Sequence, residues 1–305
     1  MNHIMFRVQV PATTANIGSG FDCLGLALDL YNTLEVEEIG EGLEIQVFGE
    51  GAGELPHSKE NLVYRSLLRT YQELGITPPP LRLKMTNEIP LARGLGSSAA
   101  AIVAGIVAAN QLTGQTIPRE RLLDLAVEVE GHPDNVTPAL LGGLVISAPK
   151  GDKAGYHCLR LEPPQELQAV VCIPEFRVVT EDARRSLPEQ IPHADAVFNI
   201  GRVSLLLGAI VSKRWDLLSA AMEDKLHQPY RRHLVPGLEG VFAQAMEAGA
   251  LGVALSGSGP SVAALVNCKA TTVGMAMEEA FGRANIKSRS LALGLNSPGA
   301  KIIKV

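Results

Sequence analysis

One short stretch constrains this chain more than any other: Pro90-Leu91-Ala92-Arg93-Gly94-Leu95-Gly96-Ser97-Ser98-Ala99-Ala100, which runs directly into an apolar, alanine-rich segment. The glycines predict a tight turn, and the alanine-rich continuation predicts a helix. The first N–H groups of a helix have no intrahelical partner, and with the positive end of the helix dipole they form a phosphate site. Ser97 or Ser98 can cap this helix, and either hydroxyl can bind a phosphate-bound metal ion. The stretch is a candidate nucleotide-phosphate loop.

The same pattern has a simpler explanation, because Gly-Ser-Ser also begins many buried helices. The stretch lacks the lysine of the Gly-x-x-x-x-Gly-Lys-[Ser/Thr] phosphate loop. Ser98 and Ala99 also stand where the dinucleotide-binding pattern has its third glycine. Other motifs in the chain are needed to distinguish a phosphate loop from a plain helix start.

Composition excludes several classes of protein. The 305 residues suffice for about two domains, and 46% hydrophobic with 19% charged residues is typical of a globular enzyme. A net charge of -5 without a Lys/Arg stripe argues against nucleic acid as a partner. The four cysteines show neither metal-site nor disulfide spacing, which favours a reducing compartment. The chain shows no secretory segment and no run of 18 apolar residues, so we expect a cytoplasmic protein that does not span a membrane.

Hydrophobic periodicity predicts an α+β protein, because strands and helices are mixed in each half. Strands are expected at 6–10, 34–39, 43–48, 81–85, 140–147, 167–173 and 252–256, with 34–39 and 43–48 as an antiparallel pair. Helices are expected at 61–74, 98–112, 119–130 and 194–226. Polar turn residues gather at 149–152, where we place a boundary between domains 1–150 and 151–305.

The end of the helix predicted at 119–130 carries a second candidate site. Glu128 and Glu130 point to different faces of that helix, so only one is expected to reach a given site. A carboxylate, a serine hydroxyl and phosphate oxygens make a suitable Mg²⁺ set. The alternative is a solvated helix end, with His132 at the surface and Asn135 as a turn residue.

The C-terminal half adds a glycine turn, Ser256-Gly257-Ser258-Gly259-Pro260-Ser261, directly after an apolar strand. Its glycines allow a backbone to approach a ligand or a neighbouring loop, although a tight turn alone also explains them. Arginine pairs stand at 184–185 and 231–232. Arginine is the preferred bidentate partner of carboxylate and phosphate, but surface arginines are commonly only solvated charge.

Three segments in this order resemble the motifs of the GHMP family of small-molecule kinases: Pro-Ala-Thr-Thr-Ala-Asn-Ile-Gly-Ser-Gly-Phe-Asp at 11–22, the stretch 90–100, and the turn 256–261. The resemblance covers nearly the whole chain. It implies an N-terminal, ATP-binding half like ribosomal protein S5 and a ferredoxin-like C-terminal half, with the active site between them. Within the family, the segments at 11–22, 132–136, 180–184 and 229–231 resemble the subgroup that phosphorylates L-homoserine for threonine biosynthesis.

The resemblance also implies residue roles. The ATP-binding residues it implies are Asn61, Pro90, Leu91, Ala92, Arg93, Gly94, Leu95, Gly96, Ser97 and Ser98. The substrate residues it implies are Asn16, Asp22, His132, Asn135, Arg184, Arg231 and Gly257, with Asn16, Asp22 and Asn135 also expected to act in catalysis. Ser98 and Glu128 would hold Mg²⁺; Glu128 is preferred because it stands four residues before His132, as the metal-binding Glu does in mevalonate kinase. The two arginines would neutralise the substrate carboxylate, and Asp22 would attract its ammonium group or orient its hydroxyl.

One departure concerns the catalytic base. Mevalonate-type kinases carry an aspartate in a Pro-Ser-Gly-x-Asp segment, whereas this chain has Pro133-Asp134-Asn135-Val136-Thr137. Phosphoryl transfer depends mainly on alignment and charge neutralisation, so we expect direct attack without a dedicated base. The alternatives are another GHMP kinase, such as a mevalonate-type enzyme, and a non-catalytic ligand-binding module on the same fold. The oligomeric state stays open, with a homodimer through the ferredoxin-like half as one arrangement.

Overall fold

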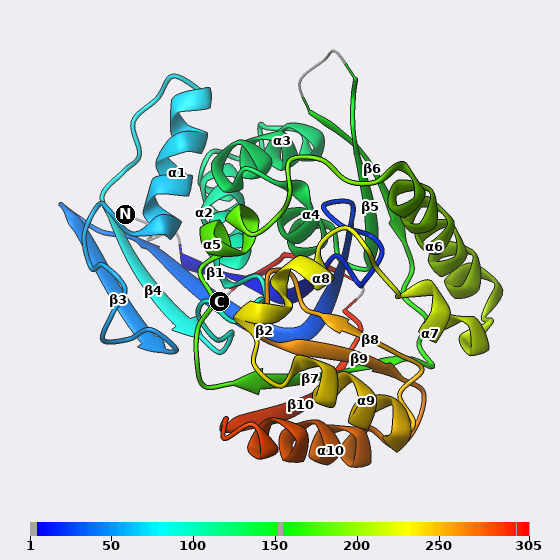
Figure 1. Cartoon of the computed structure of the whole chain (residues 1–305). Helices are drawn as coiled ribbons and strands as arrows, with labels where there is room; N and C mark the ends of the chain where they lie inside the picture. The colour runs from blue at the N-terminus through cyan, green and yellow to red at the C-terminus, as the bar shows by residue number, and fades with distance from the viewer. Residues whose placement is uncertain (1–4, 152–154, 297, 305) are drawn as a thin grey trace.

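The computed structural model describes residues 5–151, 155–296 and 298–304, which form two β-sheets with helices packed on them (Figure 1). The strands are β1 (Met5–Ala15), β2 (Leu24–Glu38), β3 (Leu43–Gly49), β4 (Leu81–Asn87), β5 (Leu144–Pro149), β6 (Tyr156–Leu161), β7 (Gln168–Pro174), β8 (Gly252–Leu255), β9 (Val262–Val266), β10 (Ser288–Gly294) and β11 (Lys301–Lys304). The α-helices are α1 (Leu62–Glu73), α2 (Ser97–Leu112), α3 (Arg119–Glu130), α4 (Pro133–Leu141), α5 (Thr180–Arg185), α6 (His193–Ser212), α7 (Leu218–Ala221), α8 (Gln228–Arg231), α9 (Leu238–Ala248) and α10 (Ala270–Arg283).

The first sheet has seven strands, with the order β11-β1-β2-β4-β3 and with β5 and β6 attached through β2. The expected strands at 34–39 and 43–48 both exist, but their predicted pairing is wrong. β4 lies between β2 and β3, antiparallel to β2 and parallel to β3. Every second residue of β4 is buried, so one face of the strand lies on the core and the other is partly exposed.

α2 lies at the centre of the N-terminal half, where it packs against α1, α3, α4 and β1. Its residues 99–110 are almost all alanine or aliphatic, and most of them are buried. A helix that is apolar on all sides belongs inside a fold. The alanine-rich run after the glycine turn is therefore the central helix of this half, and its N-terminus points out of the core at Ser97.

The second sheet is antiparallel with the order β10-β7-β9-β8. Numbered along this half, the strands stand in the order 4-1-3-2, which is the ferredoxin-like arrangement that the resemblance implied. α9 and α10 cover one face, where Val170, Val262 and Phe281 belong to a common apolar core. The α+β class is confirmed, and the chain forms two sheets as the two-part arrangement implied by the resemblance requires.

The sheets do not divide at residue 150. β6 pairs with β5, and β11 pairs with β1, so the first sheet takes in segments from beyond that boundary. The turn residues used to place the boundary include Asp152, which lies outside the described residues. The domain limits 1–150 and 151–305 therefore do not match the limits of the two sheets.

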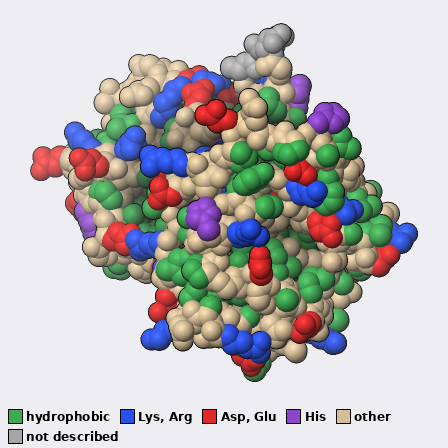
Figure 2. All heavy atoms as spheres, in the orientation of Figure 1, with side chains coloured by type: hydrophobic (Ala, Val, Ile, Leu, Met, Phe, Trp, Pro, Cys, Tyr) green, Lys and Arg blue, Asp and Glu red, His purple; other side chains and the backbone are tan. Residues whose placement is uncertain are grey.

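α6 is the one helix, within the described ranges, that is long and apolar enough to cross a membrane by length and composition. Only 22% of its apolar window is buried. Asn199, in the middle of the helix, is nevertheless buried and donates hydrogen bonds to Ser19 and Asp224. These polar bonds join α6 to the loops of the fold. On the face in Figure 2, basic and acidic side chains are interspersed rather than gathered by sign.

Candidate functional site

The glycine turn 94–96 is packed so closely that it needs its glycines. Gly94 and Gly96 have φ of 74° and 69°, the left-handed region that favours glycine. A Cβ on Gly96 would lie 2.0 Å from Oγ1 of Thr13, and a Cβ on Gly94 would lie 2.1 Å from the carbonyl oxygen of Ser256. The loop is therefore held against both of the other motif segments.

α2 begins at Ser97 with Gly96 as its N-cap and without a side-chain cap, so the expectation that a serine caps the helix is wrong. An N-cap glycine leaves the first N–H groups without a side-chain partner. These donors and the positive end of the α2 dipole remain for an anion. The geometry agrees with a phosphate loop rather than with a plain helix start.

The three motif segments contact one another directly. The hydroxyl of Ser256 donates to the carbonyl oxygen of Gly94 at 2.6 Å, and its oxygen also lies within hydrogen-bond distance of Oγ1 of Thr14, at 2.9 Å. The backbone N–H of Thr13 donates to the carbonyl oxygen of Leu95 at 3.1 Å. Segments that are far apart in the sequence thus build one surface around the glycine turn.

Two cavities meet at this loop. The first, of about 300 Å³, is lined by residues of all three motifs, α5 and α8. The second, of about 270 Å³, is mostly apolar and is lined by Leu55, Val63 and Met85 with Asn61 at the start of α1. Ala92, Ser97 and Ser98 line both cavities. A molecule with an apolar end and an anionic end can therefore reach from the second cavity past the loop into the first.

The structure brings nearly all of the expected residues to these cavities. The first is lined by every expected substrate residue: Asn16, Asp22, His132, Asn135, Arg184, Arg231 and Gly257. The expected nucleotide residues that line one or both cavities are Asn61, Leu91, Ala92, Arg93, Gly94, Leu95, Gly96, Ser97 and Ser98. Pro90 lines neither of them. Arg93 also joins the two halves of the chain, because its guanidinium donates to the carbonyl oxygen of Pro174 at 2.9 Å.

The two glutamates of α3 lie in different surroundings, and the expectation that Glu128 faces Ser98 is not met. Glu128 lies at the surface between Arg69 at 2.6 Å and Arg121 at 2.8 Å. Its partial burial raises its pKa, but the two arginines more than offset this and the net shift is downward. Glu130 instead accepts a hydrogen bond from Oγ of Ser98 at 2.7 Å and lines the first cavity. Burial raises the pKa of Glu130.

His132, the residue just before α4, lies near Glu130 and is held by a buried acid. Its Nδ1 lies 2.7 Å from Oδ1 of Asp134, and its Nε2 lies 4.0 Å from Glu130. Burial lowers the pKa of His132, but the charge and hydrogen bond of Asp134 reverse this, and the pKa is raised. Asp134 was not among the predicted site residues. It stands two residues after His132 in the same motif, which was the one signal available for it.

The loop 16–22 holds Asp22 through strained backbone. Asn16, Ile17 and Asp22 have φ of 70°, 47° and 53°, and this is costly for the β-branched Ile17. The amide of Asn16 accepts from the N–H of Asp22 at 2.9 Å and donates to the carbonyl oxygen of Gly257 at 2.9 Å. Both carboxylate oxygens of Asp22 accept from Arg184, at 3.0 and 3.1 Å. The expected acid and the first expected arginine form a pair in the site.

Arg231 is different, because it is buried without an acid partner. It is 2% exposed, and within the described part of the chain no carboxylate lies within salt-bridge distance of it. Its Nε donates to the carbonyl oxygen of Ala183 and its Nη1 to that of Gly257, each at 3.2 Å. Burial lowers its pKa. A buried guanidinium that faces a cavity in this way is a strong site for an anionic group of a ligand.

Comparison with known proteins agrees with this site. Residues 61–143 match the model of the GHMP kinases N-terminal domain, and residues 206–273 match that of the GHMP kinases C-terminal domain. A homoserine kinase from Carboxydothermus hydrogenoformans is 51% identical over 91% of this chain and 90% of its own. One from Moorella thermoacetica is 49% identical over 97% and 99%. The chain belongs to the homoserine kinases of the GHMP family.

Solved structures place this GHMP kinase in the same group. The crystal structure of homoserine kinase from Cytophaga hutchinsonii superposes with a TM-score of 0.89 at 36% identity, covering 98% of this chain and 97% of that one. L. major mevalonate kinase, solved with R-mevalonate, has a TM-score of 0.71 at 17% identity, which shows a shared fold. GHMP kinases use ATP, and the pair of cavities that meet at the Gly-Ser loop suits a nucleotide donor and a small acceptor.

Proposed function

We propose that this chain transfers the γ-phosphoryl group of ATP to the side-chain hydroxyl of L-homoserine, giving ADP and O-phospho-L-homoserine for threonine biosynthesis. The observation that carries the proposal is the buried, acid-free guanidinium of Arg231 beside the Asp22–Arg184 pair. An amino acid offers a carboxylate for Arg231 and Arg184 and an ammonium group for Asp22. The identity to named homoserine kinases supports the same substrate.

ATP fits the two cavities with its base beside Asn61 and Val63 and its triphosphate along residues 94–98. No lysine is needed there, because backbone N–H groups and the α2 dipole supply the positive potential. The γ-phosphate would then reach the first cavity at Ser97 and Ser98, where the acceptor lies. This is the arrangement that in-line transfer between the two cavities requires.

The residues present fit a magnesium ion that comes with the nucleotide. Ser98 and Glu130 offer two hard oxygen ligands 2.7 Å apart, and Glu130 is largely buried at the edge of the cavity. Among the described residues no group of three or more His, Cys, Asp or Glu side chains could hold a metal alone. Mg²⁺ commonly takes one or two protein ligands and completes its shell with phosphates and water. When bound, it would neutralise charge on the β- and γ-phosphates.

We propose Glu130 rather than Glu128 for this role. Glu128 is held by two arginines away from the loop, whereas Glu130 contacts Ser98, which the family resemblance implies as a metal ligand. The proposed metal ligands are therefore still Ser98 and a glutamate of α3, with Glu130 in place of Glu128.

Asp22 and His132, which line the acceptor cavity, are both engaged by neighbouring side chains. Both oxygens of Asp22 accept from Arg184, and His132 is engaged by Asp134 through Nδ1. Direct attack of the substrate hydroxyl on the γ-phosphate therefore remains the proposed route, with its proton passing to phosphate oxygen or solvent. The chain's own work is to align the acceptor through Asn135, Arg184 and Arg231.

The test is a substrate panel with coupled detection of ADP. L-homoserine is expected to support turnover, whereas mevalonate and galactose are not. Product identity is checked by mass spectrometry of the phosphorylated amino acid. Turnover with mevalonate in the absence of homoserine activity would move the chain to another GHMP kinase function. No ADP release with any acceptor would favour a binding module.

A further inference from the structure

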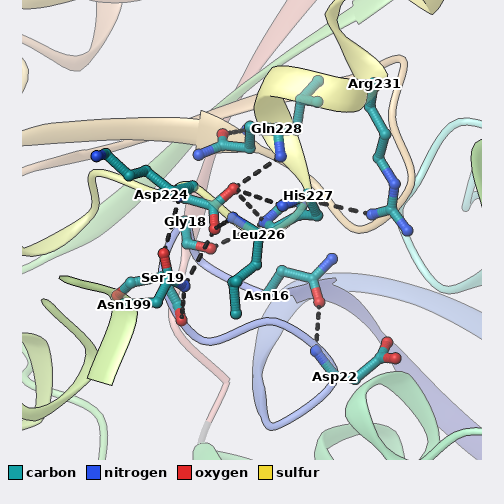
Figure 3. A network of polar contacts seen from close by, with 12 residues as sticks. Asn16, Gly18, Ser19, Asp22, Asn199, Asp224, Leu226, His227, Gln228 and Arg231 are labelled. Atoms are coloured by element: carbon teal, nitrogen blue, oxygen red, sulfur yellow. Dashed lines mark hydrogen bonds and ion pairs between the residues drawn. The ribbon is translucent and has the colours of Figure 1, made fainter. Parts of the chain in front are cut away.

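A buried polar network lies directly behind Arg231, outside the residues that line the substrate cavity (Figure 3). At its centre, the carboxylate of Asp224 accepts hydrogen bonds from the backbone N–H groups of Leu226, His227 and Gln228, at 2.8, 3.0 and 2.7 Å. It also accepts one from the side chain of Asn199 at 3.1 Å. Asp224 thereby fixes the turn from which α8 begins, and α8 carries Arg231 at its end.

His227 connects this turn to Arg231. Its side chain has no exposure, and its Nε2 lies 2.8 Å from the carbonyl oxygen of Gly18. A carbonyl oxygen only accepts, so Nε2 carries the proton. Nδ1 of the neutral ring is then an acceptor, and Nη1 of Arg231 lies 3.3 Å from it. Phe21 stacks on the ring with centroids 5.0 Å apart and also contacts the guanidinium of Arg231.

Burial, rather than the surrounding charges, favours the neutral form of His227. The ionisable groups that act on it are Asp224, whose Oδ2 lies 3.5 Å from Nε2, together with Arg231 and Asp22. Burial lowers its pKa, Arg231 adds to the effect, and Asp224 opposes it, with a net lowering. A protonated ring would place an N–H of Nδ1 against an N–H of Arg231, so the acceptor role needs the neutral ring.

We propose that His227 is a positioning residue, which orients the guanidinium of Arg231 toward the substrate carboxylate and so sets the affinity for the acceptor. The fixed bonds of Arg231 go to Ala183, Gly257 and His227, and they leave its Nη2 for the ligand. Without the acceptor at Nδ1, a buried N–H loses its partner, and the guanidinium keeps only two of the three hydrogen bonds that orient it. This inference rests on the proposed function, because it needs a carboxylate-bearing substrate.

Two substitutions separate the two ring nitrogens. The amide of His227→Asn can place an oxygen near the position of Nδ1 and keep an acceptor for Arg231. The amide of His227→Gln can place a nitrogen near the position of Nε2, which keeps the bond to Gly18 but loses the acceptor. We expect the Gln variant to raise the KM for homoserine about tenfold, and the Asn variant to stay within about threefold of the wild type. The kcat and the KM for ATP are expected to change by less than about twofold in both.

A double variant shows whether the effect passes through Arg231. In an Arg231→Met background, His227→Gln is expected to cause no further rise in the KM for homoserine. A folded Gln variant with wild-type KM overturns the proposal, as does an undiminished effect in the double variant. Should the Gln variant not fold, as judged by its thermal midpoint, the folded Asn variant decides: wild-type KM supports the proposal, and a tenfold higher KM overturns it. A wild type that forms no ADP with homoserine refutes the proposed function instead.

Discussion

Exchanging the two glutamates of α3 for glutamine, one at a time, is expected to separate catalysis from stability. Glu130→Gln keeps the size of the side chain and can still accept the hydrogen bond from Ser98, but it removes the charge at the cavity. Glu128→Gln removes a charge only from the surface cluster with Arg69 and Arg121. The two substitutions are chemically identical and lie two residues apart, so each is the control for the other.

The two substitutions are expected to change activity by very different factors and to change stability in different directions. Loss of a metal-ligating charge in a largely water-excluded site lowers kcat, or the apparent affinity for Mg²⁺, by about 100-fold or more. The raised pKa of Glu130 means that burial disfavours its charge in the free protein, so Glu130→Gln is expected to leave the free energy of unfolding unchanged or increased. Glu128 is 43% exposed, and solvent-screened pairs of this kind contribute about 0.2–1 kcal/mol each. Glu128→Gln is therefore expected to lower the thermal midpoint by roughly 2–4 °C at most.

The assay is coupled ADP release over a range of Mg²⁺ concentrations, with thermal unfolding of the same samples without nucleotide. The expected pattern is an inactive, stable Glu130→Gln variant and an active, slightly less stable Glu128→Gln variant. If Glu130→Gln kept activity within about threefold of the wild type, or if Glu128→Gln lost as much as Glu130→Gln, the metal assignment made from the structure would be refuted.

Arg231→Met is expected to raise the KM for homoserine by about 30-fold or more, because the substrate carboxylate loses its charged partner in a buried site. Steady-state kinetics that show a lower kcat with an unchanged KM would contradict this role. Gly96→Ala places a Cβ 2.0 Å from Oγ1 of Thr13 in left-handed backbone, so both ATP binding and the thermal midpoint are expected to fall. Gly282→Ala, which meets nothing within 4 Å, is its control, and equal midpoints for the two variants would contradict the close packing of the loop. Below pH 6.5 the unfolded chain protonates His227 while the folded chain, with its lowered pKa, does not, so stability falls on acidification. The His227→Gln variant is expected to lack this component, so its thermal midpoint falls less than that of the wild type between pH 7 and pH 5, and parallel profiles would contradict the reasoning.

Local sequence patterns predicted which segments form strands and helices better than they predicted which strands pair. The alternation at 81–85 correctly gives β4, but nothing in it tells that β4 inserts between β2 and β3. Pairing depends on partners that lie far along the chain, as with β11 and β1, and the alternating pattern of one strand does not identify them. The same limit explains the domain boundary. Turn residues mark where an element ends, and they carry no information about which sheet the next strand joins.

In the site, too, the sequence indicated which kinds of residue to expect better than it indicated which individual residue faces the cavity. A carboxylate does lie beside Ser98, but it is Glu130 and not the preferred Glu128, and the two are about 200° apart around a helix. Choosing between them needs the rotation of α3 about its axis, which packing against α2 and α4 determines. The spacing to His132 could not supply it, since Gly131 ends the helix with a φ of 89° and changes the direction of the chain. His227 and Asp224 carried no motif signal, because their roles depend on contacts with Gly18 and Arg231.

The charges of the site explain why an amino acid suits it better than a simple hydroxy acid. Without ligand, Asp22 and Arg184 satisfy each other, and Arg231 has an unmatched positive charge. A zwitterion can bring its carboxylate to Arg231 and Arg184 and its ammonium group to Asp22, so every charge gains or keeps a partner. A hydroxy acid without an ammonium group could pair its carboxylate with Arg231. If that carboxylate also pairs with Arg184, Asp22 loses its partner, and an unpaired carboxylate in a partly buried site is costly. Discrimination of this kind acts through unpaired charge on the wrong substrate rather than through extra contacts to the right one.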